Sequence, residues 1–359
     1  MAFQAAAGYN NLPLGNFSST IYSKKAQLAF RKKSVVSDVT SSEYFGEISG
    51  QGDSVKILLE PTISVTPYTR GANIVSQDII DNEFTLVVDK ANAFKFETDD
   101  LESKHSHVNW EQMATSQAAY RLADNYDQEV LGYMCGYKQA ENHQPASVAR
   151  VLADIPGTKA VASADDDELL ASMKISRPSF GNLTTAGSAG DSIPVAPRTL
   201  GETGLPTTFV SPLQVINRMS RMLTQQQVPM EGRFLIIDPV FQEVLLDEGS
   251  RIVNADFGGS SELKNGMING NFYGFRVYMS HNMPVIGTGP ATNTASAQAT
   301  NFGVLIAGHD SAVATAEQIN KVETFRSQAS FGDVVRGMHV YGRKILRPEA
   351  LVRAVYNLA

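Results

Sequence analysis

Residues 81–100 read DNEFTLVVDKANAFKFETDD and residues 109–138 read NWEQMATSQAAYRLADNYDQEVLGYMCGYK, and this pair of stretches decides the fold. Apolar and polar residues alternate over Phe84–Val88 and again over Ala93–Glu97, which is the two-residue period of half-buried strands. In the second stretch, apolar residues recur every three or four positions, which is the period of an amphipathic helix. The chain is therefore predicted to run from strands directly into a helix.

The predicted helix has a well-defined start and an unusual length. Asn109 is a favourable N-cap, and Gln112 three residues later completes a capping box. Over Asn109–Lys138 the helix would be roughly 45 Å long, well beyond the three turns of an average helix. A coiled-coil strand and the central helix of an ordinary globular core are the alternatives, but the sustained heptads and charged flanks that a coiled coil needs are missing. The apolar face comprises Trp110, Met113, Ala114, Ala118, Leu122, Tyr126, Val130, Met134 and Tyr137.

The residues before this region predict a long hairpin without a core of its own. Val55–Leu59 and Thr62–Thr66 have strand-like alternation, and the chain turns at Pro67–Gly71, where Gly71 can adopt a left-handed conformation. An isolated hairpin is marginally stable in water. We therefore expect this hairpin to lie on another surface, as it would in a subunit of a larger assembly.

Composition narrows the class of protein. The chain has 359 residues, of which 43% are hydrophobic and 19% charged, as in a folded protein with one large domain or a few smaller ones. Its formal net charge of -7 argues against a nucleic-acid-binding protein, which normally carries a basic footprint. A local basic cluster remains near the N-terminus, and either a solvated arm or an interaction arm explains it: Lys24, Lys25, Arg31, Lys32 and Lys33.

The single cysteine and the hydropathy pattern exclude further classes. Cys135 has no partner for an intrachain disulfide and cannot form a cysteine-based zinc site, and its place in the helix predicts an inert buried thiol. No apolar run approaches the 18 residues of a membrane span, and the N-terminus lacks the features of a signal peptide. We expect a soluble intracellular product.

The second half of the sequence predicts a mixed layer of helices and strands. Ser211, Pro212 and Gln214 form a strong helix start, and Asp238 followed by Pro239 starts another. The strands expected here are Arg233–Ile237, Phe272–His281, Phe302–Ala307, Met338–Val340 and a closing segment within Ile345–Tyr356. Short helices are expected at Ala26–Phe30, Ala146–Ala153, Asp165–Met173 and Ala312–Ile319.

Motifs that carry chemistry are largely absent from the sequence. It contains no nucleophile elbow, P-loop or zinc-protease helix. A metal site at His105 and His107 with Asp99, Asp100 and Glu102 is an alternative to an ordinary polar helix start. The acidic run Asp165–Glu168 lacks the spacing and glycine of a calcium loop. We therefore predict no catalytic, cofactor-binding or metal-binding residues, and no cofactor.

The order of these segments resembles that of a known family. Asp81–Asp100 is similar to the strands that lead into its long helix, and Arg233–Leu246 (RFLIIDPVFQEVLL) with Gly266–Pro284 (GMINGNFYGFRVYMSHNMP) resembles its helix-flanked sheet. The tail Val322–Val352 contains FGDVVRGMHVYGRKILRPEALV, which is similar to the family's usual ending. The family is that of the major capsid proteins of tailed double-stranded DNA bacteriophages, with the HK97-type fold, and the layout is closest to that of short-tailed phages.

The resemblance implies an α+β fold in four parts. These are an N-terminal arm, an extended β-hairpin loop (E-loop), a peripheral domain with a long spine helix, and an axial domain of mixed sheet flanked by helices. The implied boundaries are 1–42 for the arm, 43–83 for the E-loop, 84–210 and 312–335 for the peripheral domain with its spine helix at 109–138, and 211–311 and 336–359 for the axial domain.

The resemblance also implies partners and a location. The subunit would self-assemble through pentamers and hexamers into an icosahedral shell around the phage DNA, with its E-loop and arm on neighbouring subunits. A separate scaffolding protein, a portal and decoration proteins would be further partners, DNA would be met only through non-specific proximity, and no membrane is involved. The protein would be found in the virion after assembly in the host bacterial cytoplasm. An encapsulin-like nanocompartment shell and a cytosolic α/β enzyme are the alternatives.

Overall fold

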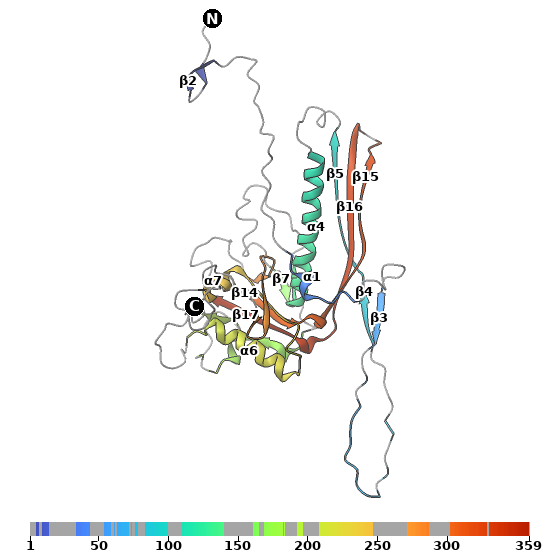
Figure 1. Ribbon diagram of the computed structural model, residues 1–359, viewed down its shortest axis with the longest axis vertical. Coiled ribbons are helices and arrows are strands. Elements are labelled where there is room, and N and C mark those ends of the chain that lie inside the picture. The colour runs from blue at the N-terminus through green and yellow to red at the C-terminus, as the bar shows by residue number, and fades with distance from the viewer. Residues whose placement is uncertain are drawn as a thin grey trace.

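The computed structural model describes 5–6, 9–13, 34–43, 54–58, 61, 63–71, 73, 76–77, 83–99, 110–139, 161–164, 169–181, 183, 192–196, 208–246, 271–286, 302–328 and 330–358. The fold is α+β, as expected, with two sheets and one long helix as its main elements (Figure 1). The helices and strands of the second half of the chain provide most of the core.

The larger sheet has eight strands of mixed direction. Its centre is β10 (Arg233–Ile237), which pairs in parallel with β12 (Phe275–Met279) and antiparallel with β14 (Phe302–His309). The strand β17 (Leu351–Leu358) pairs antiparallel with β14. Short strands complete the sheet: β8 (Lys174–Ile175), β9 (Ile193–Val195), β11 (Asn271–Phe272) and β13 (Val285–Ile286).

Apolar side chains of β10 point alternately to the two faces of this sheet, and both faces are covered. Leu235 and Ile237 belong to a core that includes α6 (Pro212–Gln225) and α7 (Pro239–Leu245). Phe234 and Ile236 belong to the core on the opposite face, together with the C-terminal end of the long helix α4 (Trp110–Met134). Burial on both faces explains why β10 reads as a continuous apolar run rather than an alternating one.

The N-terminus of α6 is capped as the sequence predicts, whereas the segment after its C-terminus is held by a contact that the sequence did not predict. The capping box at Ser211 and Gln214 is present, with the Ser211 amide donating to Gln214 Oε1 at 3.2 Å. At the other end, the buried guanidinium of Arg233 donates to the carbonyls of Pro229 at 2.8 Å and Val228 at 2.6 Å. It also donates to Thr224 Oγ1 at 3.1 Å. Arg233 therefore fixes the segment between α6 and β10.

The second sheet has three long antiparallel strands, in the order β15 (Val313–Arg326), β16 (Gly332–Ile345) and β5 (Lys90–Asp99). It runs alongside α4, as Figure 1 shows. Odd-numbered residues of β16 face the helix, because the Tyr126 ring lies edge-on to His339 at 5.3 Å and to Tyr341 at 4.9 Å. The Glu129 carboxylate accepts hydrogen bonds from Tyr341 and Arg343. The helix α4 therefore packs on both sheets.

The remaining elements are short. The hairpin of β3 (Ser54–Leu58) and β4 (Glu83–Val87) lies beside the three-stranded sheet. The other described elements are β1 (Ala5–Ala6), β2 (Tyr9–Pro13), α1 (Val36–Val39), β6 (Tyr137–Gln139), β7 (Val161–Ala164) and the 3-10 turns at Ala171–Met173, Arg177–Ser179, Asp310–Ala312 and Pro348–Ala350.

Several sequence expectations about individual elements are wrong. The long helix ends at Met134 rather than Lys138, because Gly136 adopts a left-handed conformation (φ 74°) and the chain continues into β6. The helix expected at Ala312–Ile319 is the start of β15, whose pairing with β16 overrides the local pattern. The expected strand Phe272–His281 is a β11–β12 hairpin that turns at Tyr273 and Gly274, both at positive φ.

Two further expectations are wrong for the residues that the structure describes, and two others concern residues that it does not describe. Residues 63–66, within the strand expected at Thr62–Thr66, have no strand partner. In Asp165–Met173, the described residues form only a single 3-10 turn. The helices expected at Ala26–Phe30 and Ala146–Ala153 lie outside the described residues.

The observed pairing also differs from the expected domain boundaries. The boundary at residue 336 falls inside β16, which pairs over its whole length with β15 and pairs with β5 up to Tyr341. The strands β8 and β9 were expected with the long helix but pair with β17 of the larger sheet. Residues 34–41 were expected in the free arm, yet Val35, Val36 and Val39 are buried in the core. All of these differences have one physical reason: contacts between residues that are distant in the sequence determine where these segments pack.

The pH dependence of the free energy of unfolding tests the burial of Asp238 in the core. Burial raises the pKa of Asp238 to about 6, although hydrogen bonds from Tyr356 Oη (2.5 Å) and the Phe241 amide (3.1 Å) lower it. The folded state then keeps a proton that the unfolded chain has lost, so the free energy of unfolding should fall by about 2 kcal/mol as the pH rises from 4 to 6. Urea unfolding of wild type and Asp238→Asn over this range should show the extra fall only in wild type. Equal pH slopes would contradict the assignment.

The polar contact between α4 and β16 gives a second prediction. Glu129→Ala should lower the free energy of unfolding by about 1–3 kcal/mol, because it leaves Tyr341 and Arg343 without their carboxylate partner. The control is Glu323→Ala, which removes an exposed carboxylate with two cationic partners and should leave the denaturation midpoint nearly unchanged. A smaller loss for Glu129→Ala than for the control would show that this contact does not hold the helix to the sheet.

Candidate assembly surfaces

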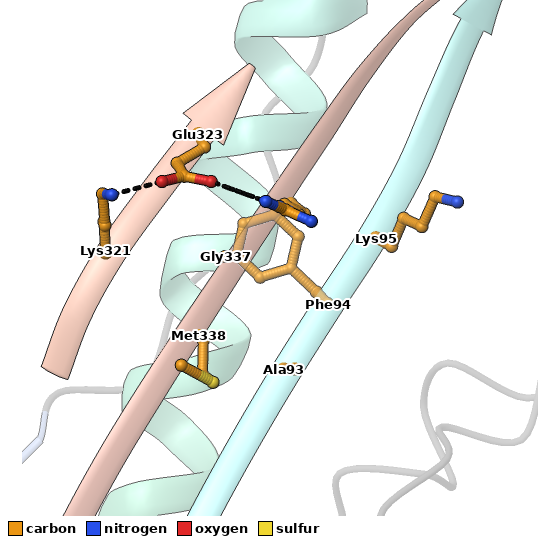
Figure 2. Close-up of a pocket in the computed structure, with 8 residues that line it drawn as sticks. Ala93, Phe94, Lys95, Lys321, Glu323, Gly337 and Met338 are labelled. Atoms are coloured by element: carbon orange, nitrogen blue, oxygen red, sulfur yellow. Dashed lines mark hydrogen bonds and ion pairs between the residues drawn. The ribbon is translucent and has the colours of Figure 1, made fainter. Parts of the chain in front are cut away.

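The face of the three-stranded sheet that points away from α4 is the first candidate surface. Arg336 and Met338 are even-numbered residues of β16, so they lie on the opposite face from His339 and Tyr341. Their cross-strand partners on β15, Glu323 and Lys321, share that face. A groove of about 640 Å³ lies here, and Figure 2 shows the side chains around it. It is lined by Ala93, Phe94, Lys95, Lys321, Glu323, Arg336, Gly337 and Met338.

The charges in the groove are paired with one another. The Glu323 carboxylate contacts Lys321 Nζ and lies 2.9 Å from Arg336 Nη2. Both cations lower the pKa of Glu323, and Lys321 has the larger effect. The Arg336 guanidinium also lies over the Phe325 ring, 5.0 Å from its centroid. The groove thus combines an ordered charge cluster with exposed apolar groups such as Met338. Mixed surfaces of this kind suit contacts between proteins.

Residue 337 of β16 is a glycine, and the space beside it on the α4 side of the sheet is filled. Gly337 lies directly opposite Phe94 in the sheet, and the Phe94 ring occupies the space that a Cβ at position 337 would need. Figure 2 shows this ring across β16 at Gly337. Phe94 and Phe96 then stack with centroids 6.1 Å apart along the side of the sheet that faces α4.

The second candidate surface is the segment that links β3 to β4. The base of the hairpin is anchored, because Leu86 is buried with Ala314 and Ala316, and Val55 and Ile57 pack beside them. Beyond the base the chain leaves the body of the molecule, as Figure 1 shows. Here Val65 is 93% exposed and Tyr68 is 65% exposed. Apolar side chains in an exposed row are typical of a surface that a partner covers.

In the described part of this segment, the side chain of Gln77 joins the two arms. The amide of Ser64 donates to Gln77 Oε1 at 3.1 Å, and Gln77 Nε2 donates to the Ser64 carbonyl at 2.6 Å. Gly71 has φ 86° at the turn that the sequence predicts. The described part of the segment thus has polar cross-links but lacks buried apolar contacts of its own.

The described residues form no cluster of metal ligands. Among them, no group of three or more His, Cys, Asp or Glu side chains is placed to hold a metal ion. His105, His107, Asp100, Glu102 and Asp165–Glu168 lie outside the described residues. Cys135 is buried, and burial raises its pKa to about 12, as for an inert thiol. None of the helices in the described part of the chain is long and apolar enough to cross a membrane.

Sequence reasoning predicted the hairpin but missed the groove. The hairpin was visible from its alternating pattern and from Gly71. The groove needs the register that sets Lys321 opposite Met338 and Glu323 opposite Arg336, and no local pattern gives a register between strands. The local signal was weak, since charged and apolar residues alternate only over Lys321, Val322 and Glu323.

Comparison with known proteins identifies the class. A profile of the phage capsid protein family matches residues 152–354, more than half of the chain. The chain therefore belongs to the phage capsid protein family. It is a structural major capsid protein of the virion, not an enzyme. No curated protein matches the sequence.

Solved phage structures have the same fold. One from Mycobacterium phage Che8 has a TM-score of 0.66 and 22% identity, and the match covers 96% of this chain and 98% of that one. The capsid asymmetric unit of cyanophage Pam1 has a TM-score of 0.63 and 13% identity, with 97% and 99% covered. The capsid of cyanophage P-SCSP1u has a TM-score of 0.61 and 16% identity, with 98% and 97% covered. The HK97-type fold expected from the sequence is confirmed.

The close contact at Gly337 gives a prediction for the packing between β5 and β16. Gly337→Ala should force the Phe94 ring aside and lower the free energy of unfolding by about 1–3 kcal/mol, the usual cost of overpacking. The matched control is Gly181→Ala, since a Cβ there meets nothing within 4 Å. Thermal unfolding of both variants measures the difference. Equal midpoints for the two would contradict the close packing of Phe94 on Gly337.

Proposed function

We propose that this capsid protein self-assembles through pentamers and hexamers into an icosahedral shell that encloses the phage DNA, and that the β3–β4 segment binds a neighbouring subunit. The single observation that carries the proposal is the exposure of apolar side chains on a segment whose base alone is packed. Leaving such side chains in water forgoes about 25 cal/mol for each Å² of apolar surface that a neighbour could cover. Assembly would recover this free energy.

The parts of the chain take the following roles in this proposal. The β3–β4 segment is the E-loop, and the residues before 34 are the arm that reaches a neighbour. The helix α4 with β5, β15 and β16 forms the peripheral domain. The larger sheet with α6 and α7 forms the axial domain, which faces the centre of a pentamer or hexamer. This division follows the observed strand pairing and assigns β8, β9 and β16 differently from the sequence expectation.

Partners other than the chain itself follow from the same role. In this proposal a separate scaffolding protein and a portal take part in assembly, and decoration proteins are further candidate partners. Assembly takes place in the cytoplasm of the host bacterium. The net charge of -7 suits a container that repels the DNA it must release. A strongly basic inner wall in a map of surface potential would contradict that last point.

Replacement of the E-loop tip tests the proposal. Exchanging residues 61–77 for a short Gly-Ser turn removes Val65 and Tyr68 but keeps β3, β4 and their buried Leu86. The subunit should fold with an unchanged circular dichroism spectrum, yet form no closed shells in electron micrographs.

The control for this variant is Thr66→Ser with Thr69→Ser, which keeps the loop length and its apolar side chains. It should assemble like wild type. Shells of normal size from the shortened variant would show that the loop is not an assembly element. An unfolded shortened variant would show that the loop belongs to the core of its own subunit.

A further inference from the structure

The segment 34–41 lies inside the subunit and not in the arm that precedes it. Val35, Val36 and Val39 are 2% exposed or less and pack in the core with Val130 and Leu131 of α4. Figure 1 shows α1 beside the C-terminal end of α4. The basic residues Arg31–Lys33 immediately precede this segment. The described segment that begins at residue 34 therefore belongs to the packed body of the subunit.

The start of α1 is capped by a residue of another helix. Its N-cap position is Val35, which has no side chain that could accept a hydrogen bond. Asp127 of α4 supplies the missing acceptor: its Oδ1 accepts from Val35 N at 2.8 Å, Val36 N at 3.0 Å and Ser34 Oγ at 2.8 Å. Asp127 is fully buried, so these three bonds compensate for the loss of water around its charge.

The same carboxylate is tied to the larger sheet. Asn282, in the turn after β12, donates through Nδ2 to Asp127 Oδ2 at 2.9 Å and to Asp124 Oδ1 at 2.9 Å. Gln128 Nε2 donates to Asp124 Oδ2 at 3.0 Å and is 3.3 Å from Asn282 Oδ1. All four side chains are buried. The arm junction, α4 and the larger sheet thus meet in one polar network.

A second contact holds the other end of the segment. The Ser41 amide donates to the Val313 carbonyl at 2.9 Å, and the Thr315 amide donates to the Ser41 carbonyl at 3.1 Å. Thr40 and Thr315 share a hydroxyl contact of 3.2 Å. The segment is thus fixed at Asp127 and at the start of β15, with three buried valines between the two points.

We propose that Asp127 is a positioning residue for assembly: its bonds to Ser34, Val35 and Val36 set the point and direction in which the basic N-terminal arm leaves the subunit. The inference rests on the proposed role of the arm on a neighbouring subunit. We call these three hydrogen bonds the Asp127 clamp. Loss of the clamp would release the start of segment 34–41 while the two sheets remain packed, because the β10, β14 and β16 contacts do not pass through Asp127.

Hydrogen exchange of the unassembled subunit tests the clamp separately from assembly. Asp127→Ala should speed exchange of the Val35 and Val36 amides roughly 10- to 100-fold, as for the loss of hydrogen bonds to a charged acceptor. Amides of β10 and β14 should keep their protection. Asp38→Asn is the control, because it removes an exposed carboxylate from the same short helix and should change neither readout. Asp127→Asn, with a nearly identical volume, provides a second variant if the alanine variant does not fold; its amide oxygen still accepts hydrogen bonds but carries no charge, so a smaller rise in exchange is expected.

Electron microscopy of the same variants tests the consequence for assembly. The proposal expects fewer closed shells, or misshapen ones, from the Asp127 variants and normal shells from Asp38→Asn. Unchanged exchange at Val35 and Val36, or an equal rise throughout the subunit, would overturn the clamp. Faster local exchange with normal shells would overturn its role in assembly. Wild-type subunits that never form shells would instead contradict the proposed function, while the exchange result would still decide the clamp.

Discussion

The packing of α4 on two sheets is the constraint on which the rest of the structure depends. Its C-terminal residues Val130, Leu131 and Met134 fill the core under the larger sheet, while Tyr126 and Glu129 hold β16 of the second sheet. Because an α-helix of this length is stiff, the two sheets keep a fixed relation to each other. The sheet of β5, β15 and β16 can then extend beyond the globular core without having a hydrophobic core of its own.

This extension exposes surface that a single subunit does not cover. The groove at Met338 lies on the face of the three-stranded sheet opposite α4, and the apolar residues of the β3–β4 segment lie beyond a hairpin whose base alone is packed. The stability of such a subunit is linked to assembly, since anything that binds only the folded state stabilises it. These elements lack a compact core within their own subunit because, in a thin shell, neighbouring subunits would cover them.

The sequence predicts the parts with strong local signals. The capping box at Ser211, the continuous apolar run of β10 and the Asp238–Pro239 helix start were each confirmed, because neighbouring residues determine them. It fails where distant contacts decide: Ala312–Ile319 becomes a strand through its pairing with β16, and Val35 is capped by Asp127, 92 positions away. The groove is unpredictable for the same reason, since it depends on strand register.

A neighbouring subunit covers the exposed β3–β4 segment in the shell that we propose. Electron cryomicroscopy of assembled shells at side-chain resolution tests this contact most directly. We expect Val65 and Tyr68, exposed in the single subunit, to be buried against another copy of the chain. Shells in which both side chains contact only their own subunit, or remain in solvent, would contradict it.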